Sequence, residues 1–169
     1  GVGFNKFPMF LWVGRNNIAD QTVLDRDITS IMSKFTNYRK LVFSVLNATN
    51  EPIGSANYIR IIAINNWLAE RFPDFYIDIR RWIIQDLLAY MGRTPTPADI
   101  ANINQDAPPP QVMADTLHLT PEASDALGHY LAYIYRTRGM VSDATQDDAD
   151  PPELTPEMKE IIRVAAVTE

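Results

Sequence analysis

The sequence predicts an α/β fold in which a parallel sheet is covered by helices on both sides. Short apolar runs that suit buried strands alternate with longer segments whose apolar residues recur at three- and four-residue spacing, as on one face of a helix. Parallel strands need a crossover helix to return the chain, so the order β-α-β-α-β-α favours this class. With 169 residues and 46% hydrophobic content, the chain is long enough for one packed domain or part of one.

Six segments make up this order. The expected strands are 8–13, 41–46 and 75–79, and the helices that follow them are 20–35, 58–72 and 82–91. The first strand ends at Gly14 and suits a strand buried on both faces. The first helix has one apolar face, whereas the second is apolar over most of its circumference and is expected to be sandwiched.

Two Thr-Pro pairs mark the starts of later helices. Thr96 is expected to cap a short helix, and Thr120 a longer amphipathic one that ends at Gly139. The predicted units are a domain over 1–141, an acidic linker over 142–154 and a C-terminal helix over 155–169. Because that last helix is short, it is expected to dock on the body or on a neighbouring subunit of an oligomer.

The composition argues against several classes of function. The formal net charge of -6 and the pI near 4.9 disfavour a nucleic-acid partner, because phosphates are neutralised by clustered Lys and Arg. Without cysteine, neither disulfides nor thiolate metal ligands can form. No stretch approaches the roughly 20 apolar residues that span a bilayer, and the start has no signal-peptide layout. A chain that opens on Gly1 suggests a cleaved or excised fragment, or an artificial boundary.

The segment Asp115-Thr116-Leu117-His118 lies between a proline-rich loop and the last large helix. A carboxylate three residues before a histidine on a turn can accept the imidazole Nδ1–H, which leaves Nε2 to take a proton from a nucleophile. Asp115 would then orient His118, and His118 would act as the base. The alternative is a surface turn followed by a helix cap.

A second segment, Gly14-Arg15-Asn16-Asn17, follows the first expected strand. An Asn side-chain N–H at the carboxyl end of a parallel strand can stabilise the negative charge of a tetrahedral intermediate. Asn16 is the candidate donor, and Arg15 beside it is the best candidate for contact with substrate. The alternative is an Asn-rich turn after a strand.

Together these segments resemble the G-x-N-D and D-x-x-H blocks of SGNH (GDSL-type) hydrolases, in that family's order and about 100 residues apart. Asn17 stands where the family usually has Asp, and the resemblance covers roughly residues 8–140. It implies a three-layer, flavodoxin-like αβα sheet to which this chain supplies about three strands. It also implies a serine esterase without metal or cofactor. The implied catalytic residues are His118, Asp115 and Asn16, and the implied substrate-binding residues are Gly14, Arg15 and Asn17.

The nucleophile of that family lies in a Gly-Asp-Ser block upstream of the Asn block, and this sequence contains no such block. Ser55, on a loop before a helix, is the internal serine whose setting best suits an activated nucleophile, with a loop or helix-cap serine as the alternative. In the strand order 2-1-3-4-5 this chain would supply strands 3 to 5, so residues 9–13 would form an apolar edge that must be covered. We therefore expect an upstream half, in a separate or cleaved polypeptide, to supply the serine and pair with 8–13.

Other polar residues have less specific patterns. His129 is expected to pair on a helix surface rather than bind a metal, because the spacing provides no further ligands. Asp78 is expected to cap a helix, although a strand end also suits a site residue. Arg80 and Arg81 are expected in a solvated first turn, with a clamp for an anionic sugar as the alternative.

These observations lead to the expectation of an extracellular or virion-associated ester hydrolase that removes acyl groups, with O-acetyl as the expected group, from a carbohydrate. The wording around Gly14 also resembles, loosely, esterase domains of bacteriophage tail proteins. The alternatives are a non-catalytic carbohydrate-binding or assembly module with the same fold, and a plain structural α/β domain.

Overall fold

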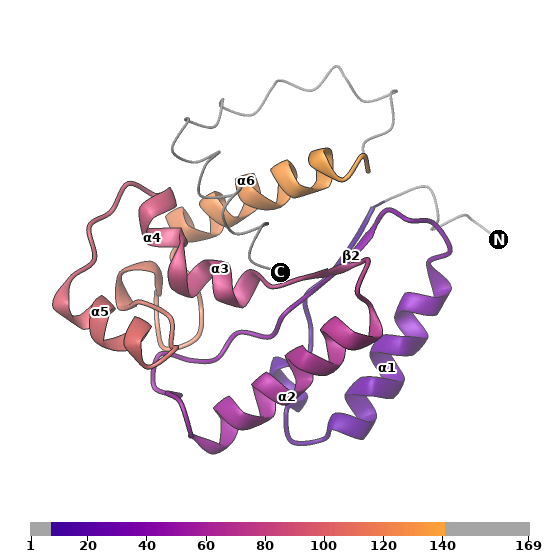
Figure 1. Cartoon of the computed structure of the whole chain (residues 1–169), viewed down its shortest axis with the longest axis horizontal. Helices are drawn as coiled ribbons and strands as arrows, with labels where there is room; N and C mark the ends of the chain where they lie inside the picture. Colours follow the sequence, from indigo (N-terminus) through magenta and orange to yellow (C-terminus); the bar gives the residue numbers. More distant parts are fainter. Residues whose placement is uncertain (1–7, 141–169) are drawn as a thin grey trace.

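The computed structural model of the chain describes residues 8–140, which form a mixed α/β fold with a parallel three-stranded sheet flanked by helices (Figure 1). The strands are β1 (Met9–Leu11), β2 (Lys40–Phe43) and β3 (Tyr76–Ile77), in the order β1-β2-β3. Both pairings are parallel, with Phe10 opposite Leu41 and Val42 opposite Tyr76. The predicted α/β class is confirmed, and β1 lies at one edge of the sheet.

Successive residues of β2 point to opposite faces of the sheet and so belong to two separate hydrophobic cores. Leu41 and Phe43 are buried in one core, and Val42 is buried in the other. The strands are shorter than the apolar runs that predicted them, because the first two runs continue as loops at the carboxyl end of the sheet and the third leads directly into the helix that begins at Ile79.

Helices α1 (Gln21–Lys34) and α2 (Ala56–Arg71) cover one face (Figure 1). Their apolar sides pack on β1 and Val42, with buried side chains at Leu24, Ile28, Met32, Ile61, Ile64 and Leu68. The prediction that the second helix is sandwiched was wrong. Ile59 on its outer side is 59% exposed, since only one side of α2 meets the sheet.

Helices α3 (Ile79–Gln85), α4 (Leu87–Tyr90) and α6 (Pro121–Thr137) cover the other face. Trp82 stacks on Tyr130 with 4.0 Å between ring centroids, which joins α3 to α6. The single helix predicted over 82–91 is in fact α3 and α4, which meet at Asp86. The boundary was missed because the apolar spacing continues across it.

The expected caps are present. Thr96 and Asp99 form a capping box at the start of α5 (Pro97–Asn104), and Thr120 accepts a hydrogen bond from Ala123 N at the start of α6. Two short 3₁₀ turns, η2 (Arg15–Asn17) and η3 (Pro110–Val112), lie in the loops.

The free edge of the sheet differs from the prediction of a strand buried on both faces. Met9 and Leu11 are buried under α1 and α2, but Phe10, Trp12 and Val13 are 45%, 43% and 40% exposed. The reason is that β1 is an edge strand whose second face is only partly covered, with Phe10 touching the rings of Phe43 and Tyr135. The prediction of an apolar edge is confirmed.

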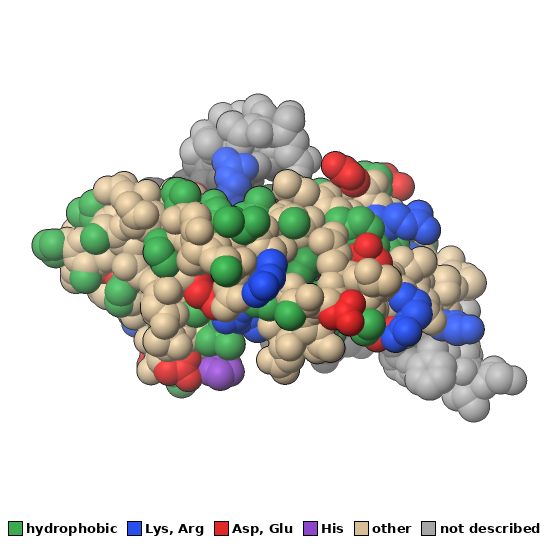
Figure 2. Space-filling model, turned by 90° about the horizontal axis from the view of Figure 1, so that it is seen from below, with side chains coloured by type: hydrophobic (Ala, Val, Ile, Leu, Met, Phe, Trp, Pro, Cys, Tyr) green, Lys and Arg blue, Asp and Glu red, His purple; other side chains and the backbone are tan. Residues whose placement is uncertain are grey.

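The predicted linker over 142–154 and the C-terminal helix over 155–169 lie outside the described residues. Within residues 8–140, no helix is long and apolar enough to cross a membrane. On the face drawn in Figure 2, acidic and basic side chains are interspersed among apolar and uncharged ones.

Candidate functional site

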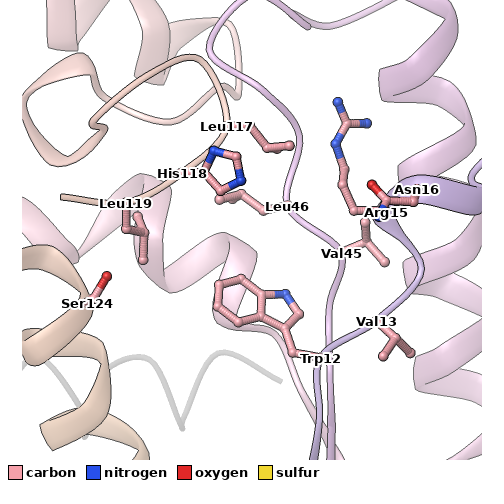
Figure 3. Close-up of a pocket in the computed structure, with 10 residues that line it drawn as sticks. All are labelled: Trp12, Val13, Arg15, Asn16, Val45, Leu46, Leu117, His118, Leu119 and Ser124. Atoms are coloured by element: carbon pink, nitrogen blue, oxygen red, sulfur yellow. The ribbon is translucent and has the colours of Figure 1, made fainter. Parts of the chain in front are cut away.

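A cavity of about 510 Å³ lies where the chain leaves the carboxyl ends of β1 and β2. Figure 3 shows residues that follow the two strands on one side of it and residues of the 117–119 loop and α6 on the other. The lining residues are Trp12, Val13, Arg15, Asn16, Val45, Leu46, Leu117, His118, Leu119 and Ser124. Asn16 and His118, separated by about 100 residues in the sequence, therefore face one cavity.

Asp115 and His118 form the predicted pair. The distance from His118 Nδ1 to Asp115 Oδ2 is 2.8 Å, and Asp115 Oδ1 also accepts the backbone N–H groups of Leu117 and His118, each at 2.7 Å. The carboxylate thus fixes both the turn and the ring, which leaves Nε2 as the nitrogen that can exchange a proton with a substrate or nucleophile.

These hydrogen bonds keep the Asp115 carboxyl charged. The backbone N–H groups of His118 and Leu117, and then the His118 side chain, lower the pKa of Asp115 from 3.8 to about 2. Both side chains are open to solvent, with Asp115 57% and His118 75% exposed. The pair is therefore preformed but not enclosed by residues 8–140.

The turn that carries Asn16 has a backbone that favours glycine. Gly14 has φ +110°, and a Cβ there would come within 3.1 Å of Val45 Cγ2. The Asn17 N–H donates to Gly14 O at 3.0 Å, which closes η2 and presents Asn16 to the cavity. Gly14 and Asn17 shape this turn but do not themselves line the cavity.

Arg15 reaches a carboxylate that the sequence did not reveal. Its Nη2 lies 2.8 Å from Glu51 Oε1, and Glu51 is only 8% exposed. Burial raises the pKa of Glu51, but hydrogen bonds from Ala48, Asn57 and Arg15 outweigh it, so the net shift is downward. No local pattern could have found Glu51, because the contact joins residues far apart in the sequence.

Arg80 is buried, so the prediction of a solvated first turn was wrong for it. It is 6% exposed, and its Nη2 pairs with Asp106 Oδ2 at 2.7 Å while its Nε donates to Asn47 Oδ1 at 2.9 Å. Asp106, at φ +51°, also accepts the Tyr58 hydroxyl at 2.8 Å. A buried charge is retained here because Arg80 Nε and Nη2 bond to polar partners, with the carboxylate of Asp106 among them.

Ser55 and Asp78 have the structural roles weighed for them. Ser55 caps α2, where its Oγ accepts the Tyr58 N–H at 3.3 Å, and Asp78 caps α3 through Arg81 N at 3.0 Å. His129 is exposed on α6. Within residues 8–140, no three His, Cys, Asp or Glu side chains gather as a metal site would require.

Sequence patterns missed two polar or aromatic residues of the cavity. Trp12 donates its indole N–H to Ser44 O at 3.1 Å, which fixes the ring at the cavity wall. Ser124, in the first turns of α6, lines the wall beside Leu119. The apolar run around Trp12 and the helical periodicity around Ser124 pointed to core and helix surface instead.

Comparison with known proteins adds no relative: no family model, no curated protein and no solved structure matches the chain.

Proposed function

We propose that the chain is part of a serine ester hydrolase whose nucleophile lies in a segment outside this sequence. The observation that carries the proposal is the Asp115–His118 pair at 2.8 Å, on a cavity that Asn16 also lines. A helix cap alone accounts for neither the side-chain pairing nor the convergence of an Asn from the other end of the chain.

The reaction follows from the roles of these three groups. The serine Oγ attacks the acyl carbonyl carbon while His118 Nε2 takes the Oγ proton, and the Asn16 side-chain N–H stabilises the resulting oxyanion. His118 then gives its proton to the leaving alcohol oxygen as the ester C–O bond breaks. Water then attacks the acyl-serine with His118 Nε2 again taking a proton, and His118 returns that proton to the serine Oγ as the acyl C–Oγ bond breaks and the acid leaves. Asp115 keeps the ring oriented throughout.

The free edge of β1 supports a location for the missing serine. A parallel strand added there would run in the direction of β1 and end beside Trp12 and Val13, which line the cavity. Such a strand, with its following helix, would also cover Phe10 and Trp12. This is the three-layer, flavodoxin-like arrangement, in which β1 is an inner strand rather than an edge.

An acylated carbohydrate is the proposed substrate, in an extracellular or virion-associated setting. The acidic chain and the mixed charges of Figure 2 suit a neutral polymer better than a polyanion. Leu46, Leu117 and Leu119 give the cavity apolar walls that suit a small acyl group.

A non-catalytic binding or assembly module is the second candidate. It is favoured by one observation, the lack of a Gly-Asp-Ser block in the sequence.

Labelling with a fluorophosphonate tests the proposal. The gene product expressed in its genomic context is purified through a tag on this chain, and the modified residue is located by mass spectrometry. We expect hydrolysis of 4-nitrophenyl acetate by this preparation but not by residues 1–169 alone, with the label on a serine outside them. His118→Ala should abolish both the hydrolysis and the labelling. A label on Ser55 or Ser124 would overturn the missing-nucleophile proposal, and an inert preparation would favour the binding module.

A further inference from the structure

The loop 47–51 touches both halves of the candidate site. At one end, the backbone N–H of Thr49 donates to Thr116 O at 2.8 Å, inside the turn that holds Asp115 and His118. At the other end, Glu51 binds Arg15, the neighbour of Asn16. The loop therefore connects two turns that lie about 100 residues apart in the sequence.

Glu51 uses both of its carboxylate oxygens. Oε1 accepts Arg15 Nη2 at 2.8 Å and Asn57 Nδ2 at 2.6 Å, and Oε2 accepts the Ala48 N–H at 2.8 Å. A buried carboxylate is stable only when such partners replace water. Arg15 is the one charged partner among them. Because Glu51 is buried, its ion pair with Arg15 is a specific link and not a chance surface contact.

The loop 47–51 is itself fixed by hydrogen bonds from two asparagine side chains. Asn47 Nδ2 donates to Glu51 O at 2.9 Å and to Asp106 O at 3.0 Å, while Asn102 Nδ2 donates to Thr49 O at 3.2 Å. These contacts tie the loop to the buried network of Arg80 and to α5. A rigid loop can transmit position from one turn to the other.

We propose that Glu51 is a positioning residue: through Arg15 it sets the place of the Asn16 amide relative to His118. The inference rests on the proposed esterase function, since it names how the oxyanion donor of that site is held. An oxyanion donor must lie within a few tenths of an ångström of its place, and a displacement of about 1 Å can cost roughly 100-fold in rate.

The same geometry gives Arg15 a role different from substrate charge recognition. Its guanidinium is bound to Glu51 and its side chain is 26% exposed, so its charge is largely neutralised within the protein. Figure 3 shows Arg15 leaving the same turn as Asn16. Arg15 therefore does not provide a free positive charge that would favour an acidic acetyl ester over a neutral one.

The first test measures the turn itself, in the 169-residue chain. Glu51→Gln is compared with Asp27→Asn, which removes the same charge from an exposed Arg26–Asp27 pair on α1. Amide hydrogen exchange is followed at Asn17, whose N–H donates to Gly14 O, and at Thr49. Glu51→Gln should speed exchange at Asn17 about tenfold or more, whereas Asp27→Asn should leave it unchanged. Unchanged exchange at Asn17 in folded Glu51→Gln protein would overturn the proposal.

The second test uses the assembled enzyme. Glu51→Gln should lower kcat by about 10- to 100-fold with KM within about twofold, because the donor acts on the transition state. Arg15→Met should have a similar effect, and the double variant should lose little more than either single one. Additive losses, or a fall only in the folded fraction, would contradict positioning through Arg15. If His118→Ala stays active, the esterase proposal fails while the exchange experiment still decides the role of Glu51.

Discussion

The two turns of the candidate site are held in opposite ways. The turn from Asp115 to His118 is held mainly by its own side chain, since Asp115 accepts three hydrogen bonds from residues at most three positions away, and we call it the self-contained turn although Thr49 N–H also donates to Thr116 O. The turn from Gly14 to Asn17, which we call the tertiary turn, depends on tertiary contacts, with Gly14 packed on Val45 and Arg15 bound to Glu51.

Because of this difference, the two turns should depend to different degrees on the position of neighbouring loops and strands. A turn held by local hydrogen bonds keeps its geometry while its side chains remain exposed. The tertiary turn is accurate only if the loop 47–51 and the carboxyl ends of the strands are in place. Substitutions in or near the two turns should therefore affect chemistry and stability in different proportions.

The largest expected effects are on chemistry, at His118 of the self-contained turn and at Asn16 of the turn from Gly14 to Asn17. His118→Ala should lower kcat/KM of the assembled enzyme by about 1,000-fold or more, because the base and later acid is lost. Asn16→Ala should cost about 100- to 1,000-fold, as expected for one oxyanion donor. Ester hydrolysis in the assembled enzyme measures both.

His129→Ala is the matched control, since His129 is the other histidine of the sequence and is exposed on α6. Its activity should equal that of the unmodified enzyme. Equal losses in the two histidine variants would remove the assignment of His118 as the base.

The next effect is on the stability of the tertiary turn. Gly14→Ala forces a side chain into φ +110° and places Cβ 3.1 Å from Val45 Cγ2, so unfolding free energy should fall by about 1 to 3 kcal/mol. Chemical denaturation of the chain measures this change in the free energy of unfolding.

Gly128→Ala is the same substitution at another glycine, and it should change the free energy of unfolding in the opposite direction. Gly128 lies inside α6, and apart from its chain neighbours and the adjacent helix backbone no atom lies within 4 Å of its Cβ position, so the variant should gain about 0.5 to 1 kcal/mol. A Gly14→Ala protein as stable as Gly128→Ala would show that the turn is not strained.

The contrast also explains how far the sequence could predict the molecule. Apolar periodicity predicted the α/β class, and local spacing predicted the Asp115–His118 contact and the caps at Thr96 and Thr120. Such features depend on residues a few positions apart. The partners Glu51 of Arg15 and Asp106 of Arg80 lie 36 and 26 residues from them, so only the fold reveals them.

A smaller effect on stability is expected at Ser55, which is connected to the tertiary turn through α2. Ser55 caps α2, whose Asn57 donates to Glu51, so Ser55→Ala should cost about 1 kcal/mol of unfolding free energy. Ester hydrolysis by the assembled enzyme should be unchanged within about twofold, since no proton transfer depends on Ser55.

Ser33→Ala is the control, because Ser33 is an exposed serine in the last turn of α1 whose Oγ donates to Ser30 O at 2.8 Å within the same helix. Its stability should be within about 0.5 kcal/mol of the unmodified chain. Abolished hydrolysis in Ser55→Ala, with normal stability, would instead identify Ser55 as the nucleophile.

The smallest expected effect is the acid titration of the self-contained turn. Because the folded pKa of Asp115 is about 2, below its ordinary 3.8, the stabilisation from its carboxylate is complete above about pH 4 and is lost as the pH falls toward 2. The carboxyl carbon signal of Asp115 in NMR should therefore have its midpoint near 2. Asp25 is an internal comparison, since burial raises its pKa and its signal should change at higher pH. An Asp115 midpoint at or above 3.8 would mean that the turn does not hold the carboxylate in solution. If instead the midpoint lies near 2, any loss of hydrolysis on acidification above about pH 4 must come from a group other than Asp115.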